Sequence, residues 1–323
     1  MGIPTDLCLD PRDIEERGVL QTSGSHSIVS RVGILLSIYF LEGWRSDKRQ
    51  ALMLILQDYL ALCPDRGMHY QPGDGRSMPA LSGMELPKPY RGLAAIGQDE
   101  ELYYNVCHYD PEEDDEVSLW RMMGFGFARS NVTRRLSGLK VHFPTGFVLD
   151  DPEHFIGLVR RWCGRLGAIH GSAGLGILTE PGSETSWGPC FYPFLTQYPA
   201  LEYDDMGGYW SESRHGGYEK PRSSNWLTVL GDDNIGALGG IEKIRSSLRP
   251  DMDLVSYNGG VVIPAGHLPA LGNEETGGIP EAYRTVARLI KPIRFEGYRW
   301  GVIKPPEPLE GLDVTLAWIR RFD

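Results

Sequence analysis

The sequence has few cysteines, and their spacing argues against the sites that cysteines usually build. Among its 323 residues are five cysteines, an odd number, and no two of them stand at CxxC spacing. This pattern favours neither a disulfide framework nor a structural zinc site, so we expect reduced thiols and neither metal nor cofactor. The cysteines are Cys8, Cys63, Cys107, Cys163 and Cys190.

A long apolar segment is also missing. The longest apolar run, VGILLSIYFL at 32–41, has about half the length that a membrane span requires. The N-terminal stretch MGIPTDLCLDPRD is acidic and unlike a secretory signal, and Asp6 stands where myristoylation favours Ser or Thr. We therefore expect a cytoplasmic protein that does not enter a membrane.

The common catalytic motifs are absent as well. The chain contains no GxSxG, HExxH or P-loop, and its glycine clusters at 124–128 and 171–176 depart from GxGxxG. His170 and His215 lie in glycine-rich or polar surroundings, and either could serve as a general base. A hydrolase that uses one of them is therefore an alternative, and otherwise no catalytic residue is predicted.

Basic residues are missing from the most acidic part of the chain. The formal net charge is −11, and residues 98–118 hold nine acids without a Lys or Arg. A field of this sign repels nucleic acid and anionic membranes, and it speeds encounter with a basic partner. Six of these acids form the run DPEEDDE: Asp110, Glu112, Glu113, Asp114, Asp115 and Glu116.

The acidic run has more than one reading. A calcium loop is disfavoured, because Asp115 stands where an EF-hand needs Gly and Arg121 where it needs Glu. The run lies between two strand-like segments, so it is expected at the tip of a hairpin. There it could serve solubility alone, or it could present phosphate-like charge to a cationic partner.

Strand-like and helix-like segments alternate without βαβ repetition. This order predicts an α+β fold of mixed, largely antiparallel sheets with packed helices. The chain is expected as one unit of 323 residues or as two similar α/β halves, 1–135 and 136–323. Strands are expected at 28–41, 102–109, 117–128, 138–149, 168–178, 225–231 and 312–322, and a hairpin that turns at Asn258 and Gly259 is expected at 252–264. Helices are expected from Ser46 and Asp151, at 191–199, from Asp233 and from Pro280, and 66–98 is expected to be irregular.

Three phrases in the second half resemble a family of bacterial proteins. They are FYPFLTQYPALEYDD (191–205), NWLTVLGDDNIGALGGIEKIRSSL (225–248) and VVIPAGHLPALGNEETGGIPEAYRTVARLIKPIR (261–294). The chain resembles the type VI secretion immunity proteins that neutralise VRR-Nuc and related restriction-endonuclease-like toxins. The resemblance implies binding of a cognate nuclease toxin in the bacterial cytoplasm, without catalysis.

Such a partner would present a basic groove for nucleic acid, because phosphate contacts dominate its affinity. We therefore expect the acidic surface of this protein to block the toxin's nucleic-acid site, with aromatic side chains as anchors and no binding to nucleic acid itself. A structural protein without a toxin partner is the remaining alternative. The candidate contact residues are the six acids of DPEEDDE together with Tyr203, Asp204, Asp205, Tyr209 and Trp210, with Tyr218 as a further aromatic candidate.

Overall fold

The fold is built around one large sheet. The computed structural model describes residues 11–22, 27–63, 68–70, 96–108, 117–131, 136–273 and 277–323. Its strands are β1 (Leu20–Gln21), β2 (Ile28–Leu41), β3 (Met68–Tyr70), β4 (Leu102–His108), β5 (Arg121–Gly126), β6 (Leu136–Phe143), β7 (His170–Leu178), β8 (Leu227–Gly231), β9 (Val255–Tyr257) and β10 (Gly260–Pro264). Its helices are α1 (Ile14–Arg17), α2 (Ser46–Leu60), α4 (Thr145–Leu149), α5 (Pro152–Leu166), α6 (Glu184–Gln197), α7 (Met206–Ser213), α8 (Asp232–Ala237), α9 (Ile241–Ser247), α10 (Glu281–Ile290) and α11 (Gly311–Ile319).

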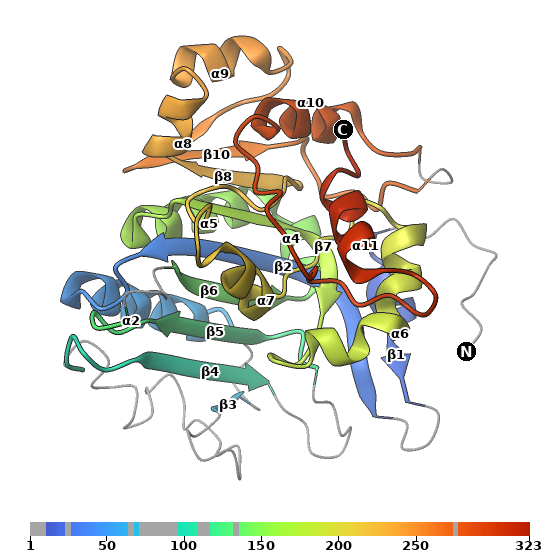
Figure 1. Ribbon diagram of the computed structural model, residues 1–323, viewed down its shortest axis with the longest axis horizontal. Coiled ribbons are helices and arrows are strands. Elements are labelled where there is room, and N and C mark those ends of the chain that lie inside the picture. The colour runs from blue at the N-terminus through green and yellow to red at the C-terminus, as the bar shows by residue number, and fades with distance from the viewer. Residues whose placement is uncertain are drawn as a thin grey trace.

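The strands form a single ten-stranded sheet in the order β3-β4-β5-β6-β2-β7-β8-β10-β9, with β1 beside β2 (Figure 1). All pairs of neighbouring strands run antiparallel. The predicted α+β class is therefore confirmed. The strand β2 lies between β6 and β7, so the sheet runs without interruption across the expected boundary between residues 135 and 136.

Helices cover both faces of the sheet. In Figure 1, α2 and α5 lie behind it, whereas α6, α7 and α11 lie in front. The helix α5 has the ends that its sequence predicts: the Asp151 carboxylate accepts a hydrogen bond from the backbone N–H of His154 at 3.0 Å, and Gly167 ends the helix with φ 56°. A side-chain cap of this kind stabilises a helix by about 1 kcal/mol.

The strand β2 is covered on both faces, which explains why its sequence is almost continuously apolar. Its even-numbered side chains from Val32 to Phe40 are fully buried against the helices behind the sheet. Its odd-numbered side chains point to the front, where Tyr39 faces α7 through ring contact with Tyr209 at 5.3 Å. We call these two sides the back face and the front face.

Several expected elements differ in the structure. The tail at 312–322 was predicted as a strand but forms α11, because Val314, Trp318 and Ile319 are buried at helical spacing. Within the predicted strand 138–149, Pro144 ends β6 and precedes α4, since a proline cannot donate to the ladder. The expected irregular stretch 66–98 contains β3, and its residues 71–95 lie outside the described part of the chain.

Helix ends also differ from expectation. Ser46 is the first residue of α2 and not its cap, a position that Arg45 occupies. The single helix expected after Asp233 is two helices, because Gly239 and Gly240 adopt φ values of 92° and 94° between α8 and α9. This left-handed backbone is open to glycine and strained for other residues. The predicted hairpin at 252–264 is confirmed as β9 and β10, which meet at Gly259 with φ 103°.

Candidate partner-binding site

The front face of the sheet carries polar and charged side chains under its helices. The register places Ser37 opposite both Lys140 and Ser172, and Tyr39 opposite His170, so these side chains share one face. All five are buried. Buried polar groups need partners to offset the loss of hydration, and the segment that follows α6 supplies them for Tyr39 and Lys140.

Residues 202–205 form that segment and are fixed beside the end of β7. The backbone N–H of Glu202 donates to the carbonyl of Leu175 at 2.6 Å, and the N–H of Ile177 donates to the carbonyl of Glu202 at 2.9 Å. This pairing sets the position of the two acids that follow, Asp204 and Asp205.

Asp204 is the centre of a buried charge network. The Tyr39 hydroxyl lies 2.8 Å from both of its carboxylate oxygens, and the Arg222 guanidinium lies 3.5 Å away. Arg222 also pairs with Glu202 at 2.7 Å, and Lys140 donates to the Asp204 carbonyl at 2.8 Å. Burial, and then the Asp204 charge, holds the pKa of Tyr39 well above its ordinary value, so the phenol remains a hydrogen-bond donor.

Asp205 lies at the edge of this network, where it begins α7. Its carboxylate accepts hydrogen bonds from the N–H of Gly208 at 2.7 Å and the hydroxyl of Thr185 at 3.3 Å. Burial, followed by the neighbouring Glu184 carboxylate, raises the pKa of Asp205 to about 6. The ionised carboxylate is therefore destabilised there.

Beside Asp205 the front face opens into a hollow of about 380 Å³ between the strands β4 and β5 and the start of α7. We call it the front groove. Its aromatic and apolar lining comes from both strands and from α7, and its polar lining is acidic. The lining residues are Glu101, Leu102, Tyr103, Met123, Phe125, Phe127, Pro181, Gly182, Glu184, Asp205, Met206, Gly207 and Trp210.

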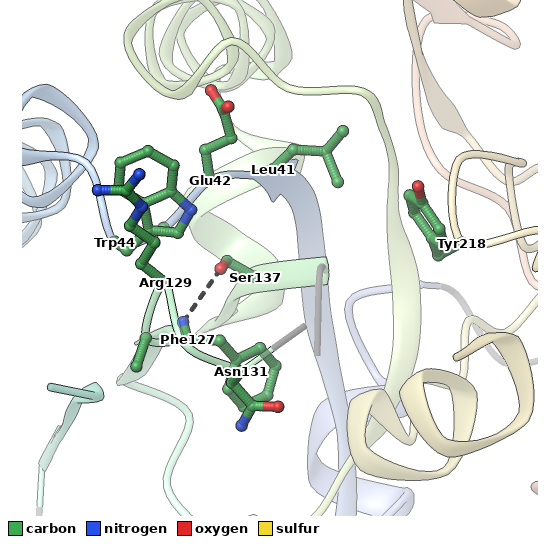
Figure 2. Close-up of a pocket in the computed structure, with 10 residues that line it drawn as sticks. Leu41, Glu42, Trp44, Phe127, Arg129, Asn131, Ser137 and Tyr218 are labelled. Carbon is green, nitrogen blue, oxygen red and sulfur yellow. Dashed lines mark hydrogen bonds between the residues drawn. The ribbon is translucent and has the colours of Figure 1, made fainter. Parts of the chain in front are cut away.

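A second hollow of about 300 Å³ adjoins the groove across Phe127, which lines both. We call it the side hollow. Figure 2 shows Tyr218 on one side of it and Trp44 with Arg129 on the other. The Arg129 guanidinium lies 5.5 Å from the centre of the Trp44 ring, within the range of a cation–π contact.

Phe127, which lies between the two hollows, is held by a backbone hydrogen bond and by ring contacts. The N–H of Phe127 donates to the Ser137 hydroxyl at 3.3 Å, as drawn in Figure 2. Its ring packs on Phe125 at 5.2 Å and on Trp210 at 5.6 Å. Aromatic pairs at these distances stabilise their arrangement beyond burial alone, so the two hollows form one aromatic surface around Phe127.

The structure separates the predicted contact residues into two groups. Tyr203, Asp204 and Tyr209 are buried, with exposed fractions of 1%, 1% and 0%. Asp205 and Trp210 line the front groove, and Tyr218 lines the side hollow. All six acids of DPEEDDE lie outside the described residues, while the strands on either side of them, β4 and β5, pair antiparallel as expected.

Sequence reasoning missed several groove residues. Tyr103 is 49% exposed although it lies within a strand, and the alternation in LYYNVCH, where one Tyr of the pair must face outward, could have identified it. Glu101 was counted as part of the acidic stretch but not as a contact residue. The segment GFGFA was considered for its glycines, and its aromatic residues Phe125 and Phe127 were not named as contact residues.

The two candidate catalytic histidines have different surroundings. The His170 Nε2 lies 3.0 Å from the Tyr218 carbonyl and 3.3 Å from the Tyr209 hydroxyl, and burial lowers the pKa of His170 to about 4. His170 is therefore neutral and held by structural hydrogen bonds at pH 7. His215 is exposed and accepts a hydrogen bond from Arg214 at 3.1 Å.

The described part of the chain holds four of the five cysteines. Cys63, Cys107, Cys163 and Cys190 are free thiols, and burial raises the pKa of Cys63 to about 12. Within the same residues, no three His, Cys, Asp or Glu side chains gather as a metal site would require. No helix there is both long and apolar enough to cross a membrane.

Comparison with known proteins places the chain among the immunity proteins of the type VI secretion system. The model of the TsiV family, type VI immunity for VRR-NUC, matches residues 57–322, and the chain belongs to this family. The predicted resemblance is confirmed, and the match extends well beyond the phrases on which it rested. Family membership implies an immunity protein directed at a VRR-Nuc toxin.

The fold is shared with a solved structure, the Pseudomonas aeruginosa T6SS protein PA0821. The two chains are 20% identical, with a TM-score of 0.78 over 94% of this chain and 87% of the other. At this identity the likeness shows the fold alone. No curated protein matches the sequence.

Proposed function

We propose that this protein neutralises its VRR-Nuc toxin by binding over the toxin's nucleic-acid site with an acidic, aromatic surface centred on the front groove. One observation carries the proposal. The exposed acids Asp99, Glu100 and Glu101 lead directly into β4, which supplies the exposed Tyr103 ring of the front groove, and Glu101 itself lines the groove. Acidic charge and an aromatic anchor therefore adjoin each other at the start of β4.

The charge suits the partner. A nuclease must hold phosphates with basic side chains, and this chain places nine acids without a compensating Lys or Arg in residues 98–118. Among the described acids of that stretch, Asp99, Glu100 and Glu101 are all exposed. Complementary fields raise association rates by roughly 10- to 1,000-fold at low salt.

The aromatic lining suits tight binding. Exposed acids at a rim contribute mainly to rate and specificity, whereas buried aromatic anchors dominate the free energy of most interfaces. Trp210 and Tyr103 are the anchors that the front groove offers. Tyr203 and Tyr209 are buried instead, and their hydroxyls donate to the carbonyls of Val302 at 3.0 Å and Lys220 at 2.8 Å.

The proposal is tested by neutralising DPEEDDE to NPQQNNQ and measuring association with the toxin encoded beside this gene. We expect the association rate at low salt to fall by roughly 10-fold or more, and its dependence on salt to flatten. A control variant neutralises six exposed acids elsewhere and should associate nearly as the parent does. The control acids are Glu153, Asp233, Asp253, Glu307, Glu310 and Asp313. Equal loss in both variants would show that only net charge matters and would contradict the proposed site.

A titration distinguishes binding from the alternative in which His170 or His215 performs hydrolysis. Nuclease activity should disappear at one equivalent of this protein if it binds the toxin. Complete loss of activity at a small fraction of an equivalent would instead indicate turnover. The variants His170→Gln and His215→Gln, tested in the same way, should inhibit with unchanged stoichiometry.

A further inference from the structure

The front groove and the side hollow differ in the basic side chains that line them. In the side hollow, a guanidinium of the chain itself, that of Arg129, lies over the Trp44 ring, and Glu42 is a further lining residue (Figure 2). The front groove has the same combination of aromatic rings and carboxylates. Among the residues that the structure describes, however, its lining includes no Lys or Arg.

Elsewhere in the molecule, tryptophan rings are also paired with arginine. The guanidinium of Arg321 lies 3.8 Å from the centre of the Trp318 ring, and that of Arg222 lies 5.5 Å from it. Arg222 also pairs with the buried Glu202 carboxylate at 2.7 Å. Aromatic ring, carboxylate and guanidinium thus recur together on this side of the sheet.

We propose that the front groove binds an arginine side chain that projects from the toxin, with its guanidinium between the Trp210 and Tyr103 rings and the carboxylates of Asp205 and Glu101. This inference rests on the proposed function and names the group that the groove recognises. Arginine suits the groove better than lysine, because its guanidinium is weakly hydrated, stacks on aromatic rings and bonds carboxylates in a planar fork.

The electrostatics of the groove favour a cation. Of its carboxylates, Glu184 is already paired with Lys140 at 2.8 Å. Within the described part of the chain, Asp205 accepts hydrogen bonds from two neutral groups, the Gly208 N–H and the Thr185 hydroxyl. Burial and the Glu184 charge raise the pKa of Asp205 to about 6, so a guanidinium beside it would stabilise the ionised form. Each carboxylate oxygen has two lone pairs, which allows Asp205 to accept a further bond while it caps α7.

An arginine of a nuclease suits this role for a further reason. A VRR-Nuc toxin that binds nucleic acid needs guanidinium groups for phosphate, and such a group exposed at its groove can enter a hollow lined by carboxylates instead. Engaging it in the front groove would remove a phosphate contact from the toxin while anchoring the complex.

The test is a set of double-mutant cycles between this protein and a nuclease-inactive form of the toxin. Trp210→Ala should shorten the lifetime of the complex by more than 10-fold, and Asp205→Asn by several-fold, since Asn preserves the helix cap. Each exposed arginine of the toxin is changed to Ala and to Lys. One of them should show strong coupling to both Trp210→Ala and Asp205→Asn, and its Lys variant should recover little of the lost lifetime.

A matched control is Trp300→Ala, because Trp300 is 81% exposed and lies outside both hollows. This variant should dissociate at the parent's rate, and thermal melting should show that every variant is folded. Absence of coupling between Trp210 and any toxin arginine would overturn the inference, as would full recovery by lysine. If the charge-neutralised DPEEDDE variant still lost association rate in that case, the proposed function would stand and only the arginine assignment would fail.

Discussion

The two faces of the central sheet bury different kinds of side chain. On the back face, β2 places side chains such as Leu36 and Ile38 against helices, and both are fully buried. On the front face, the same strand places Ser37 and Tyr39 beside Lys140 and His170, which are nearly as inaccessible. Hydrophobic burial is non-directional, whereas each buried charge requires a particular partner.

This difference bears on function because the front face supports the groove. The network of Arg222, Glu202 and Asp204 fixes the segment that leads into α7, and Asp205 and Trp210 project from that segment into the front groove. Directional contacts hold a binding surface in one geometry more strictly than apolar packing does. The polar face therefore positions the site, and the apolar face supplies most of the stability.

The largest effect is expected from Arg222→Met, which removes the cation of the front-face network. Glu202 and Asp204, with exposed fractions of 0% and 1%, would lose their ion pair. Breaking a buried pair from one side costs about 3 to 5 kcal/mol of unfolding free energy, measured by urea denaturation at pH 7. A loss below about 1 kcal/mol would show that the network is not needed for stability.

A somewhat smaller loss is expected from Leu36→Ala on the back face. This change leaves a cavity among fully buried apolar side chains and should cost about 3 kcal/mol. No titratable group is altered, so the loss should be the same at pH 5 and pH 8 by urea denaturation. A marked pH dependence would show that the packing of Leu36 is coupled to a titratable group.

The smallest effect, of opposite sign, is expected from Asp205→Asn. The folded-state pKa of Asp205 is raised to about 6 from an ordinary value of 3.8. Its contribution to stability is therefore fully present below about pH 4 and is lost as the pH rises through 6. The Asn variant lacks this loss, so it should be more stable than the parent by about 2 to 3 kcal/mol at pH 7.

Denaturation curves between pH 4 and pH 8 check this expectation, since the advantage of the Asn variant should disappear toward pH 4. An unchanged advantage across that range would place its origin elsewhere than in ionisation. Weaker binding of the toxin by the same, more stable variant would show that the acid is retained for recognition and not for stability.

The fold was largely predictable from local sequence, and the groove was not. The 14 residues of β2 have the predicted bounds, because β-branched and aromatic side chains fit both buried faces of a central strand. A similar composition led to the wrong prediction of a strand at 312–322. Most of these residues form α11, because burial at helical spacing overrides strand propensity. Motif reasoning identified Asp205 and Trp210, yet it could not separate them from buried Tyr203 and Tyr209, because exposure depends on which segments cross the front face.

Hydrogen exchange measured with and without the toxin tests the central claim most directly. If the toxin binds over the front groove, exchange should slow in α7 and in residues 127–131, while α2 and α5 behind the sheet should exchange at unchanged rates. Protection confined to α2 and α5, with none in α7 or 127–131, would contradict the claim that the front face of the sheet carries the immunity function.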